Sequence, residues 1–148
     1  MPFHFEFDRK HRILRVSMAG TLDDAGIDEF RAEIAKLLRE VQPKACIVDL
    51  SAVQKYHASP EHVRAIGRAA PGVPNVFIPV IAIAPSPHLF GMSRMFQLTS
   101  DETRPWFRVV KSADEACKIL EVVSLSFDPL PSNPEELKKM RNDPDPSQ

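Results

Sequence analysis

The 148-residue sequence is poor in the residues that build several common kinds of functional site. It has only five glycines, and none lies in a pattern that could cradle a phosphate, which argues against a nucleotide-binding P-loop. Its two cysteines, Cys46 and Cys117, lie in apolar segments with no CxxC partner or neighbouring histidine. We therefore expect both to be small buried core residues rather than metal ligands. Their scarcity agrees with a cytoplasmic protein.

The sequence also lacks an excess of charge and a long apolar run. It has 19 Lys and Arg against 20 Asp and Glu, so it lacks the basic surplus that favours nucleic-acid binding. The longest apolar run, around 76–85, is interrupted by Pro79 and is far shorter than the roughly 20 residues of a membrane-spanning helix. Residues 1–11 lack the apolar core of a secretory signal. We expect one cytoplasmic globular domain that neither binds nucleic acid nor inserts into a membrane.

Apolar residues repeat along the chain with two different spacings, one typical of strands and one typical of helices. Apolar alternation over 3–7 and the apolar segment 13–18, separated by a polar turn, predict an antiparallel hairpin. Short apolar runs predict three further strands, at about 45–50, 76–84 and 106–110. Helical spacing predicts four helices, at about 23–41, 60–70, 86–100 and 112–123. This order predicts an α/β fold: a mixed, mostly parallel sheet with an N-terminal antiparallel hairpin and about four helices packed on it.

Local signals predict how some of these elements begin and end. Asp23 or Asp24 can cap the first helix, which ends before Pro43. Pro79 must lie at a sheet edge or a bulge, because it has no N–H to donate. Ser112 opens a capping box with Glu115, and we expect the helix that follows to bury a stripe reaching Val123.

The composition changes after Val123. Five of the fourteen prolines lie within 125–148, where few large apolar residues occur. We therefore divide the chain into a domain over 1–124 and a Pro-rich C-terminal tail over 125–148, with a short helix at 134–140. The last eight residues are expected to be disordered. Because the tail should contribute little apolar surface, we expect its removal to leave the fold intact.

Four segments in this order resemble the STAS domain family, the fold of bacterial anti-sigma-factor antagonists. The segments are VSMAGTLDDAGIDEFRAEI, VDLSAV, PHLFGMSRMFQLTS and VVKSADEACKIL. They are similar to the family's first strand-to-helix passage, its D-L-S-x-V strand end, its R-x-F helix and its closing strand and helix. The resemblance extends over roughly 13–123. It implies a STAS-like fold and a regulatory role without catalysis.

The turn that follows VDLSAV departs from the family pattern. In the antagonists that the resemblance suggests, a D-S-S-G-like turn comes at once, and its first serine is phosphorylated by a partner kinase. Here His57-Ala58-Ser59-Pro60 follows three residues later, so the acceptor position falls on Ala58, or on Lys55 without a gap, and neither has a hydroxyl. Ser59 is the remaining candidate for phosphorylation, since a helix N-terminus stabilises a phosphate. We favour a simpler role for Ser59 as the N-cap of the helix that Pro60 begins.

No pattern in the sequence predicts catalysis. The nearest approximation to a G-x-S-x-G nucleophile elbow, 90–94, lies within a helical pattern. His57 and His62 would not share a helix face, and no H-x-x-x-H pair is present. We therefore expect a protein without enzymatic activity and without a cofactor.

The leading hypothesis is a cytoplasmic protein-interaction module of STAS type. Its partner would be another regulatory protein, for example one similar to an anti-sigma kinase, and the chain could also form a homodimer. Tyr56 is the only tyrosine and stands among polar residues, which fits a contact surface better than a core. The predicted contact residues are Lys55, Tyr56, His57, Ser59, Glu61, His62 and Arg64.

The alternative hypothesis is a domain that binds or senses a small apolar, lipid-like ligand. STAS-like folds can resemble lipid-binding domains, and the segment around the third predicted helix is rich in Phe and Met. The residues that could line such a pocket are Phe90, Met92, Met95 and Phe96. Ordinary core packing explains these four side chains more simply than a ligand site does.

Overall fold

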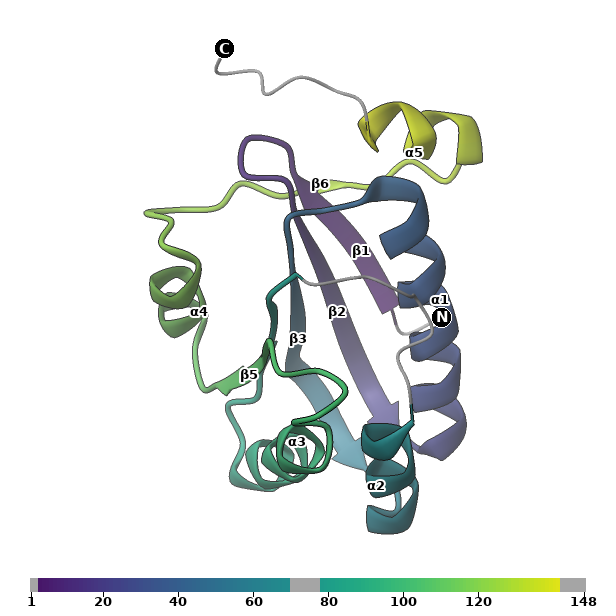
Figure 1. Ribbon diagram of the computed structural model, residues 1–148, viewed down its shortest axis with the longest axis vertical. Coiled ribbons are helices and arrows are strands. Elements are labelled where there is room, and N and C mark those ends of the chain that lie inside the picture. The colour runs from purple at the N-terminus through teal and green to yellow at the C-terminus, as the bar shows by residue number, and fades with distance from the viewer. Residues whose placement is uncertain (1–2, 70–77, 142–148) are drawn as a thin grey trace.

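The computed structural model describes residues 3–69 and 78–141. A six-stranded sheet in the order β5-β4-β3-β2-β1-β6 forms the centre of the molecule (Figure 1). Its strands are β1 (Phe3–Asp8), β2 (Ile13–Leu22), β3 (Ala45–Tyr56), β4 (Val80–Ile83), β5 (Phe107–Val110) and β6 (Asp128–Pro129). β1 pairs antiparallel with β2 and β6, whereas β2, β3, β4 and β5 run parallel. The predicted mixed, mostly parallel sheet with an N-terminal hairpin is therefore confirmed.

Within the described ranges, five helices accompany the sheet. They are α1 (Asp24–Val41), α2 (Pro60–Arg68), α3 (Pro87–Thr99), α4 (Ala113–Leu120) and α5 (Pro134–Arg141). The first four begin at side chains that accept a backbone N–H, namely those of Asp23, Ser59, Ser86 and Ser112. Glu121 adopts a left-handed conformation with φ of 59°, which ends α4 earlier than predicted. Val123 is consequently fully exposed, and its expected place in a buried stripe is wrong.

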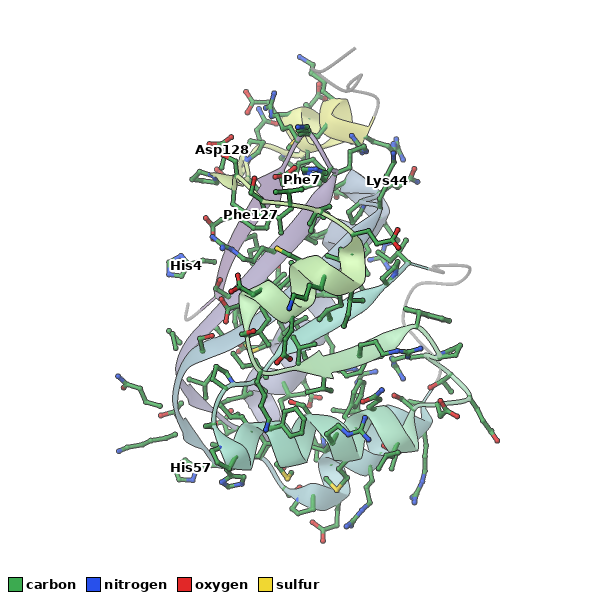
Figure 2. The ribbon with its side chains drawn as sticks, turned by 90° about the vertical axis from the view of Figure 1, so that its left-hand side faces the viewer. His4, Phe7, Lys44, His57, Phe127 and Asp128 are labelled. Atoms are coloured by element: carbon green, nitrogen blue, oxygen red, sulfur yellow. The ribbon has the colours of Figure 1, made fainter. Side chains whose placement is uncertain are left out.

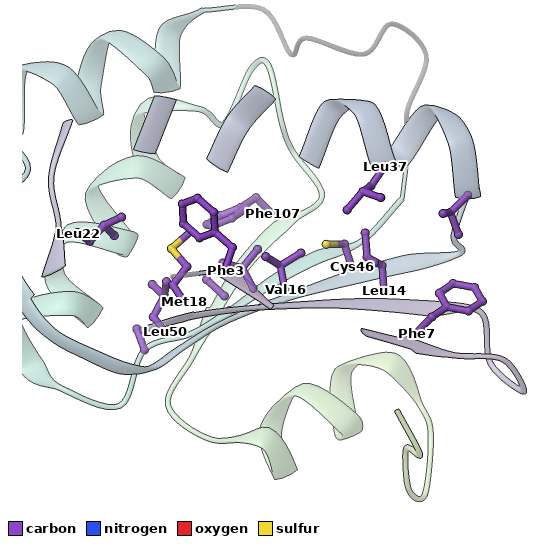
Figure 3. Packing of buried hydrophobic residues seen from close by; sticks show 14 of the residues in the cluster. Phe3, Phe7, Leu14, Val16, Met18, Leu22, Leu37, Cys46, Leu50 and Phe107 are labelled. Carbon is purple, nitrogen blue, oxygen red and sulfur yellow. The ribbon is translucent and has the colours of Figure 1, made fainter. Parts of the chain in front are cut away.

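Helices pack on both faces of the sheet. On one face, a large buried cluster lies beneath α1, and Figure 3 shows Leu37 of that helix above Cys46 and Leu14. On the other face, a smaller cluster joins α4 to the parallel strands through Ala116. Cys46 is buried as predicted, and burial raises the pKa of its thiol to about 12. Cys117 is only half-buried, which corrects the expectation for that residue.

β3 is longer than its apolar run predicted. Its pairing with β2 shifts register twice, on either side of Gly20, and continues as far as Leu22 and Tyr56. Gly20 has φ of 80°, a conformation that side chains beyond glycine rarely adopt. Because the pairing continues past these shifts, Lys55 and Tyr56 belong to a strand rather than to a turn.

β4 begins directly after Pro79 and lies inside the sheet between β3 and β5. The carbonyl oxygen of Pro79 accepts a hydrogen bond from the backbone N–H of Cys46 at 3.0 Å. Pro79 therefore joins the ladder only as an acceptor, ahead of the strand, and the expected edge or bulge position is wrong. The first residues of the predicted strand 76–84 fall outside the described residues.

The segment after residue 124 packs against the rest of the fold. β6 pairs with β1, and the predicted short helix is present as α5, which lies against α1. Leu137 and Met140 are each only 5 % exposed, so the expectation that this segment adds little apolar surface is wrong. The expectation failed because Leu137 and Met140 are three residues apart and therefore lie on the same face of the two-turn helix α5. The division at residue 124 stays a prediction. The predicted disorder over 141–148 is wrong for Arg141, which is the last residue of α5, and the other seven residues fall outside the described residues.

Candidate functional site

A hydrogen-bond network joins the N-terminal ends of α1 and α2. The backbone N–H of Ser59 donates to Oδ1 of Asp24 at 2.8 Å, and its hydroxyl donates to Oδ2 of the same carboxylate at 3.2 Å. The Ser59 hydroxyl also accepts from the backbone N–H of His62 at 3.1 Å. The predicted N-cap role of Ser59 is therefore confirmed, whereas its contact with Asp24 was not predicted.

A second contact continues this junction one turn further along both helices. Nε2 of His62 lies 2.9 Å from Oδ1 of Asp28, four residues after Asp24 on α1. The side chain of Asp28 is 55 % exposed, so this contact adds little stability. Together the two contacts fix the orientation of α2 relative to α1.

The predicted contact residues fall into two groups. Lys55, His57, Glu61 and Arg64 are exposed, and Figure 2 shows His57 projecting from the end of the molecule that carries α3. Ala58, where the resemblance would place a phosphorylated serine, is buried at 8 % exposure. Ser59 and His62 are half-buried within the junction. The structure thus brings four of the seven residues to the surface around the start of α2.

Tyr56 does not behave as a free surface residue. Its side chain is half-buried, packs against the large buried cluster, and its ring centroid lies 5.2 Å from that of His88. Burial and the charge of Asp24 raise the pKa of its hydroxyl to about 12. Tyr56 is therefore a neutral residue that connects the core to the surface, and His88 is a neighbour that sequence reasoning did not foresee.

An apolar cavity of about 250 Å³ lies between the sheet and α1, α2 and α3. Its floor includes strand residues of the large cluster, several of which Figure 3 shows, among them Met18, Cys46 and Leu50. Met92 and Phe96 line it, as the alternative hypothesis expects, whereas Phe90 and Met95 do not. Phe90 packs on the buried cluster instead, and Nζ of Lys111 lies 5.0 Å from its ring centroid.

Two arginines lie in the same lining. Nη1 of Arg104 donates to the carbonyl oxygens of Ile66, Gly67 and Ala69, at the C-terminal end of α2. Burial and the charge of Arg31 lower the pKa of Arg104. Sequence analysis gave neither arginine a role, although Arg31 lies in one of the segments that resemble the STAS family. Arg31 and Arg104 lie far apart in the sequence and come together only in the fold.

Residues 3–69 and 78–141 also lack a membrane-spanning helix and a metal-binding cluster. No helix in these ranges is long and apolar enough to cross a membrane. Nor do these ranges contain a cluster of three His, Cys, Asp or Glu side chains that could hold a metal ion.

The fold of this chain is similar to those of known proteins with solved structures. No family model and no curated protein matches the sequence. The unphosphorylated form of the anti-sigma factor antagonist SpoIIAA matches with a TM-score of 0.52 and 17% identity, over 82% of this chain and 99% of that one. An anti-sigma factor antagonist from Mycobacterium paratuberculosis matches with a TM-score of 0.50 and 20% identity, over 80% and 92% of the two chains. The chain therefore has the STAS-like fold of the anti-sigma factor antagonists.

Proposed function

We propose that the chain is a regulatory module of STAS type that binds another regulatory protein and catalyses no reaction. The fold is shared with proteins described as anti-sigma factor antagonists, which supports a partner of the kind such antagonists regulate. The proposed contact region, which we call the α2 surface, consists of Lys55, His57, Glu61 and Arg64. The observation that carries the proposal is the junction between Ser59 and Asp24, which holds these exposed side chains on a fixed frame. The site of action would be the cytoplasm.

We further propose that phosphorylation at this turn does not switch the module. The Ser59 hydroxyl already donates to a carboxylate and accepts from the start of α2. A phosphate on that oxygen would place two negative charges against Asp24, and repulsion would offset the benefit of the helix N-terminus. Ala58 offers no hydroxyl and is buried.

Affinity capture from the native host, with variants of the bait, tests the α2 surface. We expect the double charge reversal Lys55→Glu/Arg64→Glu to lose the captured regulator. The control is Lys118→Glu, a charge reversal at an exposed position on α4, where the opposite sheet face lies. Direct binding should then be measured with the purified regulator, where a loss of at least tenfold in affinity is expected. Equal binding by both variants, or capture of only a second copy of the chain, would contradict the proposal.

A second candidate function has its own observation. The cavity beneath α1 is lined mainly by apolar side chains, which favours the alternative of a small apolar ligand, and its volume lies just below the usual size range of small-molecule sites. Native mass spectrometry of protein purified from its host tests it. A bound small molecule supports this function, and protein that is free of ligand and takes up none on incubation contradicts it.

A further inference from the structure

The cavity combines an apolar floor with two cationic side chains. Val48, Leu50 and Ala82 contribute buried apolar surface from the sheet. Arg31 from α1 and Arg104 from the segment before β5 are half-buried in the same lining. Among the described residues that form this lining there is no Asp or Glu. Charged side chains are seldom placed beside apolar surface without a counter-charge, because desolvation makes such a placement costly.

The two arginines differ in their contacts with the rest of the described chain. Arg104 caps the C-terminal end of α2, where carbonyl oxygens and the helix dipole favour a cation. All the hydrogen bonds that Arg104 makes with other described residues use Nη1. Arg31 has no hydrogen bond or ion pair with any residue in the part of the chain described. Burial, and secondarily the charge of Arg31, lower the pKa of Arg104.

We propose that the cavity binds a small amphiphile with an anionic head group, which Arg31 and Arg104 hold while its hydrocarbon chain lies against Val48, Leu50 and Ala82. This inference rests on the second candidate function and names its ligand class. A guanidinium pairs well with a carboxylate or a phosphate, so the shared chemistry is a terminal anion. The volume of about 250 Å³ is near the lower limit for ligand pockets and therefore suits a medium-length chain.

The single tryptophan of the chain provides a reporter, because Trp106 also lines the cavity. We suggest titrating the full chain with decanoate and with decanol, below their aggregation limits, and following the fluorescence of Trp106. The two probes have the same chain length and differ in charge. We expect decanoate to bind at least tenfold more tightly than decanol, since one charge-assisted hydrogen bond is worth roughly that factor.

Two variants separate charge from packing. Arg31→Met keeps an unbranched apolar stem and removes the charge, and it breaks no hydrogen bond of the described fold. We expect it to weaken decanoate binding about tenfold and to leave decanol binding unchanged. Arg39→Met is the matched control, because Arg39 is exposed on the same helix and lies outside the lining. A circular dichroism melt of each variant confirms that it is folded.

The outcomes distinguish the inference from the function on which it rests. Preference for decanoate that Arg31→Met abolishes and Arg39→Met retains supports the proposal. Equal affinity for decanoate and decanol overturns the anionic head group but leaves an apolar ligand site in place. Failure of both probes to bind the folded wild-type chain overturns the inference and the second candidate function together.

Discussion

The hydroxyl oxygen of Ser59 lies 3.2 Å from Oδ2 of Asp24, a residue 35 positions earlier in the chain. This contact joins the first turns of α1 and α2, and it determines how the turn responds to added charge. A helix N-terminus by itself favours an anion. Because the carboxylate of Asp24 already lies there, we expect a negatively charged group on residue 59 to be destabilising instead.

Substitutions at Ser59 test this reversal. Ser59→Ala should lower the free energy of unfolding by about 1–2 kcal/mol, because the cap is lost. Ser59→Asp keeps a capping oxygen but should also be less stable than the wild type, since its carboxylate faces Asp24. Chemical denaturation of Ser59→Asp in the wild-type and Asp24→Asn backgrounds measures the coupling. Identical losses in both backgrounds would show that repulsion between the two positions is absent.

Tyr56 should titrate at unusually high pH. Burial, and secondarily the charge of Asp24, raise its pKa from 10.0 to about 12 in the folded chain. The unfolded chain therefore releases this proton first, so the stability that Tyr56 contributes is complete below pH 10 and falls as the pH rises toward 12. Because Tyr56 is the only tyrosine, ultraviolet absorbance follows it directly. Tyr56→Phe should remove this part of the alkaline destabilisation, and tyrosinate formation near pH 10 in the folded chain would contradict the prediction.

Removing the segment after residue 124 should destabilise the fold. The truncation exposes the surfaces that Leu137 and Met140 cover, and burial of each such side chain is worth roughly 1.5–3 kcal/mol. It also removes the Met140 carbonyl oxygen, one of the acceptors of the Arg12 side chain. Thermal unfolding measures the loss, with the full chain as the reference. An unchanged midpoint in the shorter chain would restore the original expectation of a dispensable tail.

Two helical glycines should respond oppositely to alanine. A Cβ atom on Gly67 of α2 would collide with Oγ1 of Thr99 on α3, whereas one on Gly91 would enter open space. We expect Gly67→Ala to cost about 1–3 kcal/mol by forcing the two helices apart. Gly91→Ala should stabilise by roughly 0.5–1 kcal/mol through helix propensity. The two variants form a matched pair in urea denaturation, and a stabilising Gly67→Ala would show that α2 and α3 separate freely.

Local patterns predicted the parts of the fold that depend on near neighbours in the sequence. The Ser59, Ser86 and Ser112 caps each involve a backbone N–H three residues ahead, so the sequence predicts them directly. The hairpin of β1 and β2 is equally local. These local elements were sufficient to predict the fold class from the sequence.

Features that depend on distant residues could not be predicted in this way. The extension of β3 to Tyr56 depends on pairing with Leu22, and the burial of Tyr56 depends on the cluster beneath α1. The second partner of Ser59 and the meeting of Arg31 with Arg104 involve separations that no periodic pattern records. Tertiary packing determines each of these features, so local sequence patterns could not predict the charged residues of the cavity.

The hydrogen bond from Arg12 to the carbonyl oxygen of Met140 can form only when synthesis of the chain is nearly finished. It joins residues 128 positions apart and connects the β1–β2 hairpin to α5. During synthesis the N-terminal strands leave the ribosome long before α5 does. Until then, the apolar surface that Leu137 and Met140 later cover stays open to solvent. A nascent chain stalled before α5 should therefore be a good chaperone substrate, whereas the finished chain should be released.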